Sequence, residues 1–359
     1  MKLELITSEF KRMVTCAAKG AGNDKLSPLT TYLGIDVKDN TLYLRTTDGS
    51  NFLVCKKPKV TCENFAVVVD CDSFVNLIKK TTSEHIILNV EDDVIKIKGN
   101  GNYQIACVTD EHGEAFVFPA AENNFDLLAF QPVKVKSKVF ETVFEVNTAS
   151  VSKVLDTPVL TGFYFGTNGV MTTDSLKLCV FDVNVFKRDV LLSLDFVRLA
   201  TLFTEEDVKV YFIDNDVVME TGNIVIYGSQ MQDIETYPVE ALQGLIQQEY
   251  SSKCVVKKAL LLAALDRLNI FVTEYEKNGV TLHFTKDGLE LYSKKAKELL
   301  PYDESENYKD FSCLLELPKL KEQIATIRED VVGFAYGNPN IILMEEPKVI
   351  HILSTMEEV

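Results

Sequence analysis

The sequence predicts an α+β fold of three repeated domains, in each of which helices pack on antiparallel β-sheet. A β-hairpin pattern occurs three times, with Gly34, Gly162 and Gly279 in register about 120 residues apart. Each third also contains an amphipathic helix pattern that runs directly into another hairpin pattern. The length of 359 residues agrees, because it suits two or three domains.

The first repeated element is a stretch of alternating apolar and polar residues, a short turn, and a second alternating stretch. It occupies residues 32–48, 160–174 and 277–293. The turns contain Asp-Asn, Asn-Gly and Asp-Gly, which favour tight hairpins. We therefore expect a hairpin in each third of the chain.

The second repeated element is a helix followed by a hairpin, and another helix opens each third. The helices that precede hairpins are expected at residues 72–81, 193–203 and 317–328, and the opening helices at 8–19, 148–155 and 257–271. Six helix-and-strand units result. Near residues 132 and 245 the sequence shows little regular apolar pattern, which marks a boundary between domains. The predicted domains are therefore 1–132, 133–245 and 246–359.

The composition predicts a soluble globular protein, because 46% of the residues are hydrophobic and 25% are charged. No apolar run approaches the roughly 18 residues of a membrane-spanning helix. The first seven residues contain an acid, Glu4, within a short apolar stretch and offer no cleavage site, so we expect no signal peptide. A cytoplasmic protein without membrane contact is expected.

The net charge of −16 disfavours nucleic-acid binding if the charge is spread evenly, because phosphate contacts need Lys and Arg. An acidic protein can still carry its basic residues on one surface. The distribution of charge therefore decides the question.

The sequence contains no pattern typical of an enzyme or a metal site. The eight cysteines stand singly without a Cys-x-x-Cys pair, and the four histidines have no partner at ligand spacing. The glycine-rich segments 20–23 and 99–102 lack the Lys and the following helix of a phosphate-binding loop. We expect no catalytic residue, no metal and no cofactor, and cysteines that act as buried, reduced hydrophobes.

Four segments resemble the bacterial β sliding clamp family, the processivity factor of DNA polymerase III. Residues 160–162 (Leu-Thr-Gly) and 172–178 (Thr-Thr-Asp-Ser-Leu-Lys-Leu) are similar to the family's leucine-x-glycine and threonine-aspartate-glycine-histidine-arginine-leucine segments. Tyr237-Pro238 resembles its phenylalanine-proline pair, and residues 349–359 resemble its apolar final strand. The resemblance covers the whole chain and implies three DNA-clamp domains that assemble head to tail into a homodimeric ring.

The chain departs from the family pattern at two places. Ser175 and Leu176 replace the usual glycine and histidine, and Ser354 or Thr355 stands where the last strand usually has a proline. The tail also ends in acids instead of a basic residue. The sequence therefore resembles a divergent member, and the departures affect the choice of partner peptide.

The resemblance implies that the ring encircles double-stranded DNA without sequence preference and tethers the replicative polymerase for processive replication. Basic residues on helices would then face the DNA, although solvated helix faces are an equal alternative for each residue. The candidates are Lys11, Arg12, Lys19, Lys25, Lys79, Lys80, Lys153, Arg198, Lys257, Lys258, Arg267, Lys319, Lys321 and Arg328.

The resemblance also implies an apolar pocket that binds short peptides of the polymerase and the clamp loader. The alternative is that the same residues fill the core between the second and third domains, which we favour for Leu242. For Leu160 and Leu178 we favour the pocket. The candidates are Leu160, Thr173, Leu178, Pro238, Leu242, Ile352, Leu353 and Met356.

The subunit interface would join the first domain of one subunit to the third domain of the other. The resemblance suggests Ile270 and Phe271 on one side, facing an edge strand with Tyr103, Ile105 and Cys107 on the other. Packing within one domain is the alternative, above all for Cys107. A competing function is a non-enzymatic adaptor or structural protein with the same fold that does not encircle DNA.

Overall fold

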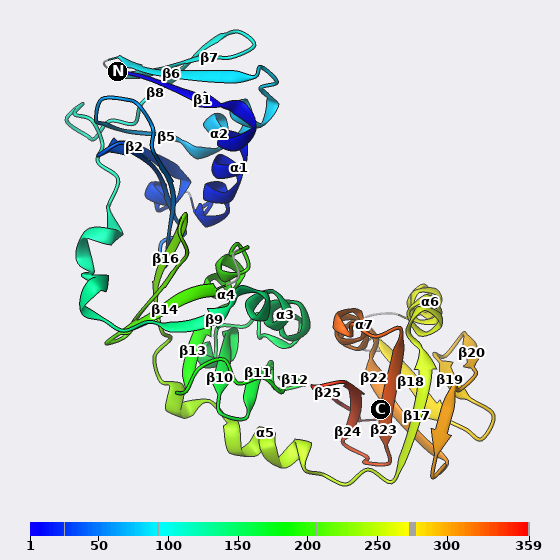
Figure 1. Cartoon of the computed structure of the whole chain (residues 1–359). Helices are drawn as coiled ribbons and strands as arrows, with labels where there is room; N and C mark the ends of the chain where they lie inside the picture. The colour runs from blue at the N-terminus through cyan, green and yellow to red at the C-terminus, as the bar shows by residue number, and fades with distance from the viewer. Residues whose placement is uncertain (25, 92, 205–206, 273–277, 358–359) are drawn as a thin grey trace. The chain divides into compact units, whose positions relative to one another are not determined.

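The computed structural model describes the whole chain except residues 25, 92, 205–206, 273–277 and 358–359 (Figure 1). The chain forms two compact units. Unit 1 comprises Met1–Phe140 and Asp195–Gln230, and unit 2 comprises Glu141–Leu194 and Met231–Val359. Two helices contain the points where the chain passes from one unit to the other. Helix α3 (Ser137–Asn147) begins in unit 1 and ends in unit 2, and α4 (Leu194–Ala200) begins in unit 2 and ends in unit 1.

The large sheet of unit 1 has eight strands, all antiparallel to their neighbours. The β4–β16 pair, in which Leu53 lies opposite Ile226, joins strands of the predicted first and second domains. In spatial order the strands are β5 (Phe65–Asp70), β2 (Tyr32–Lys38), β3 (Thr41–Thr47), β4 (Phe52–Pro58), β16 (Ile224–Ser229), β15 (Asp216–Glu220), β14 (Asp207–Ile213) and β9 (Val133–Lys136).

The small sheet of unit 1 has the order β1 (Lys2–Ile6), β6 (His85–Glu91), β7 (Val94–Lys98), β8 (Asn102–Ala106). Figure 1 shows the helices α1 (Thr7–Ala17) and α2 (Cys71–Lys80) side by side in this unit. They pack together through Phe10 and Phe74, whose rings meet edge to face at 6.1 Å. Both helices bury apolar residues at helical spacing. Short 3₁₀ helices lie at Ala18–Gly20, Pro28–Thr31, Ala121–Asn124 and Leu127–Ala129.

The large sheet of unit 2 has nine antiparallel strands. Its β12–β25 pair joins strands of the predicted second and third domains, with Leu178 opposite Ile352. The spatial order is β13 (Val190–Ser193), β10 (Gly162–Gly166), β11 (Gly169–Thr173), β12 (Lys177–Phe181), β25 (Val349–Ser354), β24 (Ile341–Glu346), β23 (Val331–Tyr336), β17 (Ser252–Lys257) and β21 (Glu304–Glu306).

The small sheet of unit 2 has the order β20 (Lys297–Leu300), β19 (Leu289–Tyr292), β18 (Gly279–Phe284), β22 (Phe311–Glu316). Helices α6 (Lys258–Asn269) and α7 (Leu317–Thr326) bury leucines in the same core as these strands. Phe284 and Tyr336 stack at 4.0 Å between their ring centroids in that core. The remaining helices are α5 (Val239–Ile246) and the 3₁₀ helices at Thr148–Ser150, Pro158–Thr161 and Ile234–Thr236.

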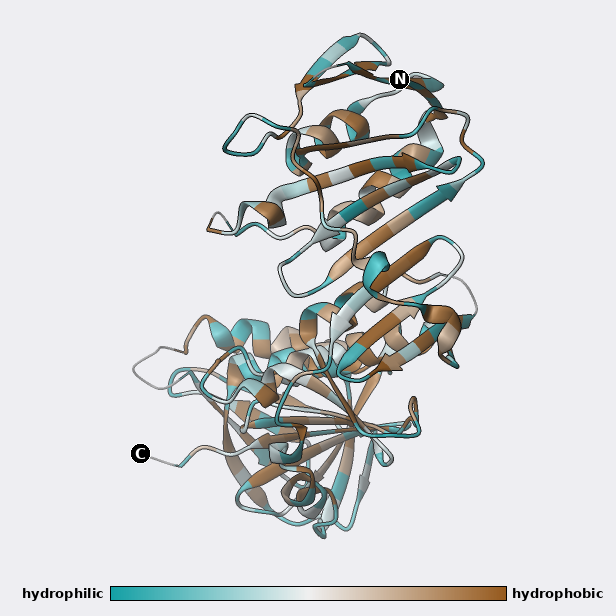
Figure 2. Ribbon diagram, turned by 90° about the vertical axis from the view of Figure 1, so that its left-hand side faces the viewer, coloured by the Kyte–Doolittle hydropathy of each residue, from teal (hydrophilic) through white to brown (hydrophobic). Residues whose placement is uncertain are grey.

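The α+β prediction is confirmed, with antiparallel sheets and helices in both units. Figure 2 shows hydrophobic residues in the strands and helices of the chain, interspersed with hydrophilic ones. The repeated hairpins are present as β2–β3, β10–β11 and β18–β19. The division into three domains stays a prediction. None of the described helices is long and apolar enough to cross a membrane.

The predicted helix at residues 148–155 is wrong. The helix lies earlier, at Ser137–Asn147, and only Thr148–Ser150 forms a single 3₁₀ turn. Apolar residues at 140, 143 and 146 recur at helical spacing and are buried. The following Thr148, Ser150 and Ser152 favour turns, because their hydroxyls compete for backbone hydrogen bonds.

Candidate functional site

Four of the predicted pocket residues lie in one apolar cluster of unit 2. Leu178 and Ile352 stand opposite each other in β12 and β25, Leu242 comes from α5, and Leu160 from the 3₁₀ helix before β10. All four side chains are buried, with 2–7% of each residue exposed. The structure therefore brings these residues together as a packed cluster.

The other predicted pocket residues are not members of this cluster, although Thr173 pairs with Leu178 and the Pro238 carbonyl accepts from Leu242 N. Leu353 belongs to the core beneath α6 and α7, because it points to the opposite face of β25 from Ile352. Thr173 is buried, and its hydroxyl donates to the Lys177 carbonyl at 2.7 Å. Met356 is half-buried and forms an isolated bridge with Leu314. Pro238 is the N-cap residue that precedes α5, and it borders a cavity.

A cavity of about 460 Å³ opens beside Leu160. Its wall includes the exposed side chains of Val154 and Leu176, and the ammonium of the buried Lys177. Lys177 Nζ lies 2.7 Å from Glu322 Oε2 and 3.6 Å from Asp174 Oδ2. The cavity thus combines apolar walls with a fixed ion pair, which suits a short segment with both apolar and polar groups.

The Glu322 carboxylate is held in its charged form. Burial raises its pKa, but hydrogen bonds and charge from Lys177 and Lys153 lower the pKa overall. Sequence reasoning did not assign Lys177, Glu322 or Val154 to a site. For the exposed Leu176, the sequence indicated only that the residue departs from the family pattern, and not that it borders a cavity.

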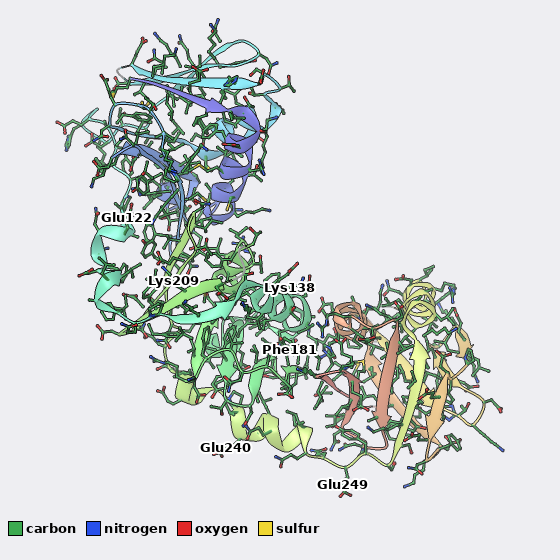
Figure 3. The ribbon with its side chains drawn as sticks, in the orientation of Figure 1. Glu122, Lys138, Phe181, Lys209, Glu240 and Glu249 are labelled. Atoms are coloured by element: carbon green, nitrogen blue, oxygen red, sulfur yellow. The ribbon has the colours of Figure 1, made fainter. Side chains whose placement is uncertain are left out.

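A second cavity of about 760 Å³ lies between α5 and strand β10. Tyr164 and Tyr237 stack here at 4.8 Å, and the Tyr237 hydroxyl donates to the Met171 carbonyl at 3.1 Å. Burial, together with a hydrogen bond to Asp189, raises the pKa of Tyr164 to about 12. Glu240 projects from α5 away from the strands (Figure 3).

The basic candidates of unit 1 are largely exposed to solvent. Arg12, Lys19, Lys79 and Lys80 are exposed and Lys11 is half-buried, and none of them forms an ion pair with a described acid. Arg198 is paired with Asp195 at 3.1 Å. Lys25 lies outside the described residues.

The basic candidates of unit 2 are mostly paired. Arg267 forms a bidentate pair with Glu298 at 2.8 and 2.5 Å, and Lys321 pairs with Asp266. Lys319 pairs with Glu316, and Lys153 lies 3.5 Å from Glu322.

Lys258 donates to backbone carbonyls at the end of α7, including Ala325 at 3.3 Å. The Arg328 guanidinium lies 3.9 Å from Glu346 and 5.7 Å from the ring centroid of Phe181, which Figure 3 labels at the end of β12. Lys257 is exposed at the end of β17. Little free positive charge remains on the described helices of unit 2.

The outer strands of the small sheets are β1 and β8 in unit 1, and β20 and β22 in unit 2. We consider β8 and β20. In unit 1, β8 carries the exposed Tyr103 and the half-buried Ile105, with Cys107 just beyond. In unit 2, sequence reasoning missed β20 because its four residues show no clear alternation. Ile270 and Phe271 follow α6 with 77% and 43% of their surface exposed. Edge strands leave backbone groups unpaired and can accept another strand.

The described residues include no group of three or more His, Cys, Asp or Glu side chains arranged to hold a metal ion.

No protein-family model matches the chain. The β sliding clamp of Staphylococcus aureus is 24% identical over 289 residues, which cover 74% of this chain and 73% of that protein. The DNA polymerase sliding clamp of Bacillus subtilis superimposes with a TM-score of 0.83 at 14% identity, covering 100% of both chains. The DNA polymerase III β subunit of Borrelia burgdorferi, solved in complex with a natural product, gives a TM-score of 0.84 at 18% identity over 99% of both chains.

These structural matches cover 99–100% of the chain. The chain therefore has the fold of the bacterial β sliding clamps and is similar to them in sequence.

Proposed function

We propose that this protein is a non-enzymatic DNA sliding clamp that encircles double-stranded DNA and tethers a replicative polymerase. The observation that carries the proposal is the match of the entire chain to solved sliding clamps at TM-scores of 0.83 and 0.84. In this proposal the chain has three domains, 1–132, 133–245 and 246–359. It acts in the cytoplasm.

The face of α1 and α2 supports a sequence-independent contact with DNA. Along α1 and the turn after it, Ser8, Arg12, Thr15 and Lys19 follow one another at helical spacing. On α2, Lys79 and Lys80 are exposed in the last turn. Positive charge without base-reading geometry is what a sliding contact needs, because phosphates carry no sequence information.

The paired charges of unit 2 support a weaker contact there. Each Lys or Arg that is held by an acid has its charge compensated and must exchange partners before it can bind a phosphate. We therefore assign the main phosphate contacts to Arg12, Lys19, Lys79 and Lys80.

The free edges support a head-to-tail homodimer. Strand β8 of one subunit would pair with strand β20 of the other, and Ile270 and Phe271 would be covered at the same junction. Two equivalent junctions close a six-domain ring, since two-fold closure is the commonest symmetry of homo-oligomers.

The cavity beside Leu160 is our candidate for the docking of polymerase and clamp-loader peptides. Its apolar groups, Val154, Leu160 and Leu176, would anchor apolar side chains of such a peptide. Lys177 would fix the peptide backbone or an acidic group through a charge-assisted hydrogen bond. The cavity next to Pro238 would accept the remainder of the segment.

The test has two steps. Light scattering over a dilution series should give about twice the chain mass of 40.3 kDa. Protein bound to a nicked circular duplex should then stay with the DNA during gel filtration, and should be lost when a restriction enzyme linearises the circle.

A protein that stays monomeric at every concentration would contradict the proposal. Equal retention on circular and linear DNA would also contradict it, because only an encircling protein distinguishes the two. Either result would favour the adaptor function instead.

A further inference from the structure

Helix α1 of unit 1 packs on strand β4 in a fixed register. At one end of the contact, Lys57 Nζ donates to Glu9 Oε2 at 2.7 Å. At the other end Gly20, just after the helix, lies so close to β4 that an added Cβ would come within 2.5 Å of Leu53 Cβ. These two contacts fix which residues of α1 face which residues of β4.

Cys16 and Cys55 occupy the middle of this contact. On α1, residues 9 and 16 share one face, because positions seven apart lie about two turns along a helix, and Gly20 follows in the 3₁₀ turn after the helix. On β4, Leu53, Cys55 and Lys57 alternate onto one face of the sheet. The two cysteines therefore face each other between the outer contacts, and each thiol influences the pKa of the other.

A third contact supports the same register. Thr46 Oγ1, on the neighbouring strand β3, donates to the Ala17 carbonyl at 2.6 Å. Thr46 stands opposite Leu53 in the β3–β4 pair, and Leu44 stands opposite Cys55. Ala17 directly follows Cys16, so this hydrogen bond holds the end of α1 that carries Cys16 over the β3–β4 pair.

The two thiols differ in environment. Cys16 is partly exposed, whereas Cys55 is buried with 2% of its surface exposed. The interaction with the Cys55 thiol lowers the pKa of the Cys16 thiol, and the same interaction together with burial raises the pKa of Cys55. Cys16 therefore ionises first and is the thiol that a small reagent can reach.

The other cysteines do not share these properties. Burial raises the pKa of Cys71, Cys179, Cys254 and Cys313, which are all buried. Burial also raises the pKa of the partly exposed Cys62 and Cys107. A reagent that selects a thiolate should thus react at Cys16 before the others.

We propose that Cys16 and Cys55 form a redox-sensitive pair that a hydroperoxide converts into an intramolecular disulfide. The Cys16 thiolate attacks one peroxide oxygen, the O–O bond breaks, and the products are a sulfenic acid and one molecule of water or alcohol. The Cys55 sulfur then attacks the Cys16 sulfur, the S–O bond breaks, and the released hydroxide leaves as water with the thiol proton. The two sulfurs supply the two electrons that reduce the peroxide.

This inference is independent of the proposed function, since it needs only unit 1 and an oxidant. The product would tie α1 to β4 and close a loop from residue 16 to residue 55. Such a cross-link restricts the unfolded chain and raises the resistance to unfolding.

The test uses the full chain, fully reduced and then exposed to hydrogen peroxide. Peptide mapping without reductant should find the Cys16 peptide joined to the Cys55 peptide, and the intact mass should fall by two hydrogen atoms. The melting temperature should rise and return to its original value after treatment with a thiol reductant.

Two variants separate the steps, and a third is the control. Cys55→Ser should accumulate a sulfenic acid at Cys16 that dimedone captures, and Cys16→Ser should leave Cys55 reduced. Cys62→Ser should form the same cross-link as the natural chain. Oxidation of Cys62 or Cys107 while Cys16 and Cys55 stay reduced would overturn the proposal, as would a disulfide from Cys16 to a second chain.

Discussion

Gln323 joins helix α7 to two paired strands of unit 2 and is fully buried. Its side-chain Nε2 donates to the Ile352 carbonyl at 3.1 Å and to the Leu178 carbonyl at 3.2 Å. It also lies 3.3 Å from Ser150 Oγ. Because Leu178 and Ile352 stand opposite each other in β12 and β25, one amide supports both strands where they meet.

Substituting Gln323→Met should lower the free energy of unfolding by about 1–3 kcal/mol, because buried carbonyls lose their side-chain donor while the volume is nearly kept. Urea unfolding followed by circular dichroism measures the change. Gln247→Met, at an exposed position after α5, is the matched control and should change stability little. Equal effects of the two substitutions would show that the Gln323 hydrogen bonds contribute nothing.

Glu346 is a second buried polar residue of unit 2, close to His351 and Arg328. Burial raises its pKa, but the His351 side chain, the Arg328 backbone N–H and the Arg328 charge lower it overall. A carboxyl whose folded pKa lies below its usual 4.5 stabilises the fold above that value. This stabilisation is lost as the pH falls from 4.5 through the lowered folded pKa.

Glu346→Gln should therefore flatten the acid limb of the stability curve. The natural chain should lose more stability than the variant between neutral pH and pH values below about 4.5. Melting temperatures across this range measure the difference. Parallel curves for the two proteins would mean that Glu346 makes no contribution to acid unfolding.

At the scale of elements, local pattern was sufficient for most helices and hairpins. The helices α1, α2, α4, α6 and α7 lie where apolar residues recur at helical spacing, and β2–β3 lies where alternation surrounds Asp-Asn. The prediction failed at residues 148–155, where turn-forming Ser and Thr follow the true helix. It also left out α5, whose eight residues are bounded by Pro238 and a polar segment.

The β2–β3 turn offers a test of such local signals. Asp39 and Asn40 have φ angles of 50° and 57°, which is the left-handed pair of a type I′ turn. Asn40→Val should destabilise the protein by about 1–2 kcal/mol, because a branched side chain disfavours this conformation. Asn40→Gly should be neutral or stabilising in the same urea titration. If both variants lose the same amount of stability, the cause would be the loss of the Asn40 side-chain amide and not the left-handed backbone conformation.

At the scale of the whole molecule, local sequence patterns could not predict which distant strands pair with each other. The β4–β16 and β12–β25 pairs join strands about 170 residues apart in sequence, and no periodicity encodes such a partner. The candidate pocket was predictable in part. Leu160, Leu178, Leu242 and Ile352 meet, but the ion pair of Lys177 with Glu322 depends on how α7 packs and leaves no signal in the sequence.

The distribution of charge leads to a prediction for the whole chain, which rests on the proposed contact with DNA. Lys79→Ala with Lys80→Ala removes two exposed charges of α2, and Arg267→Ala with Lys319→Ala removes two charges that acids already hold. Both double variants change the net charge by the same amount. Their general electrostatic effect on DNA binding is therefore matched.

The α2 variant should bind a short duplex more weakly than the natural chain. The slope of log affinity against log salt should become less steep by about 0.9 for each phosphate that the variant no longer binds. The unit 2 variant should change the slope much less, because its charges bind acids before they can bind phosphate. Fluorescence anisotropy at several salt concentrations measures both slopes. A larger reduction of affinity in the unit 2 variant would move the main DNA-binding surface to α6 and α7, and equally small reductions would exclude both helix pairs from that surface.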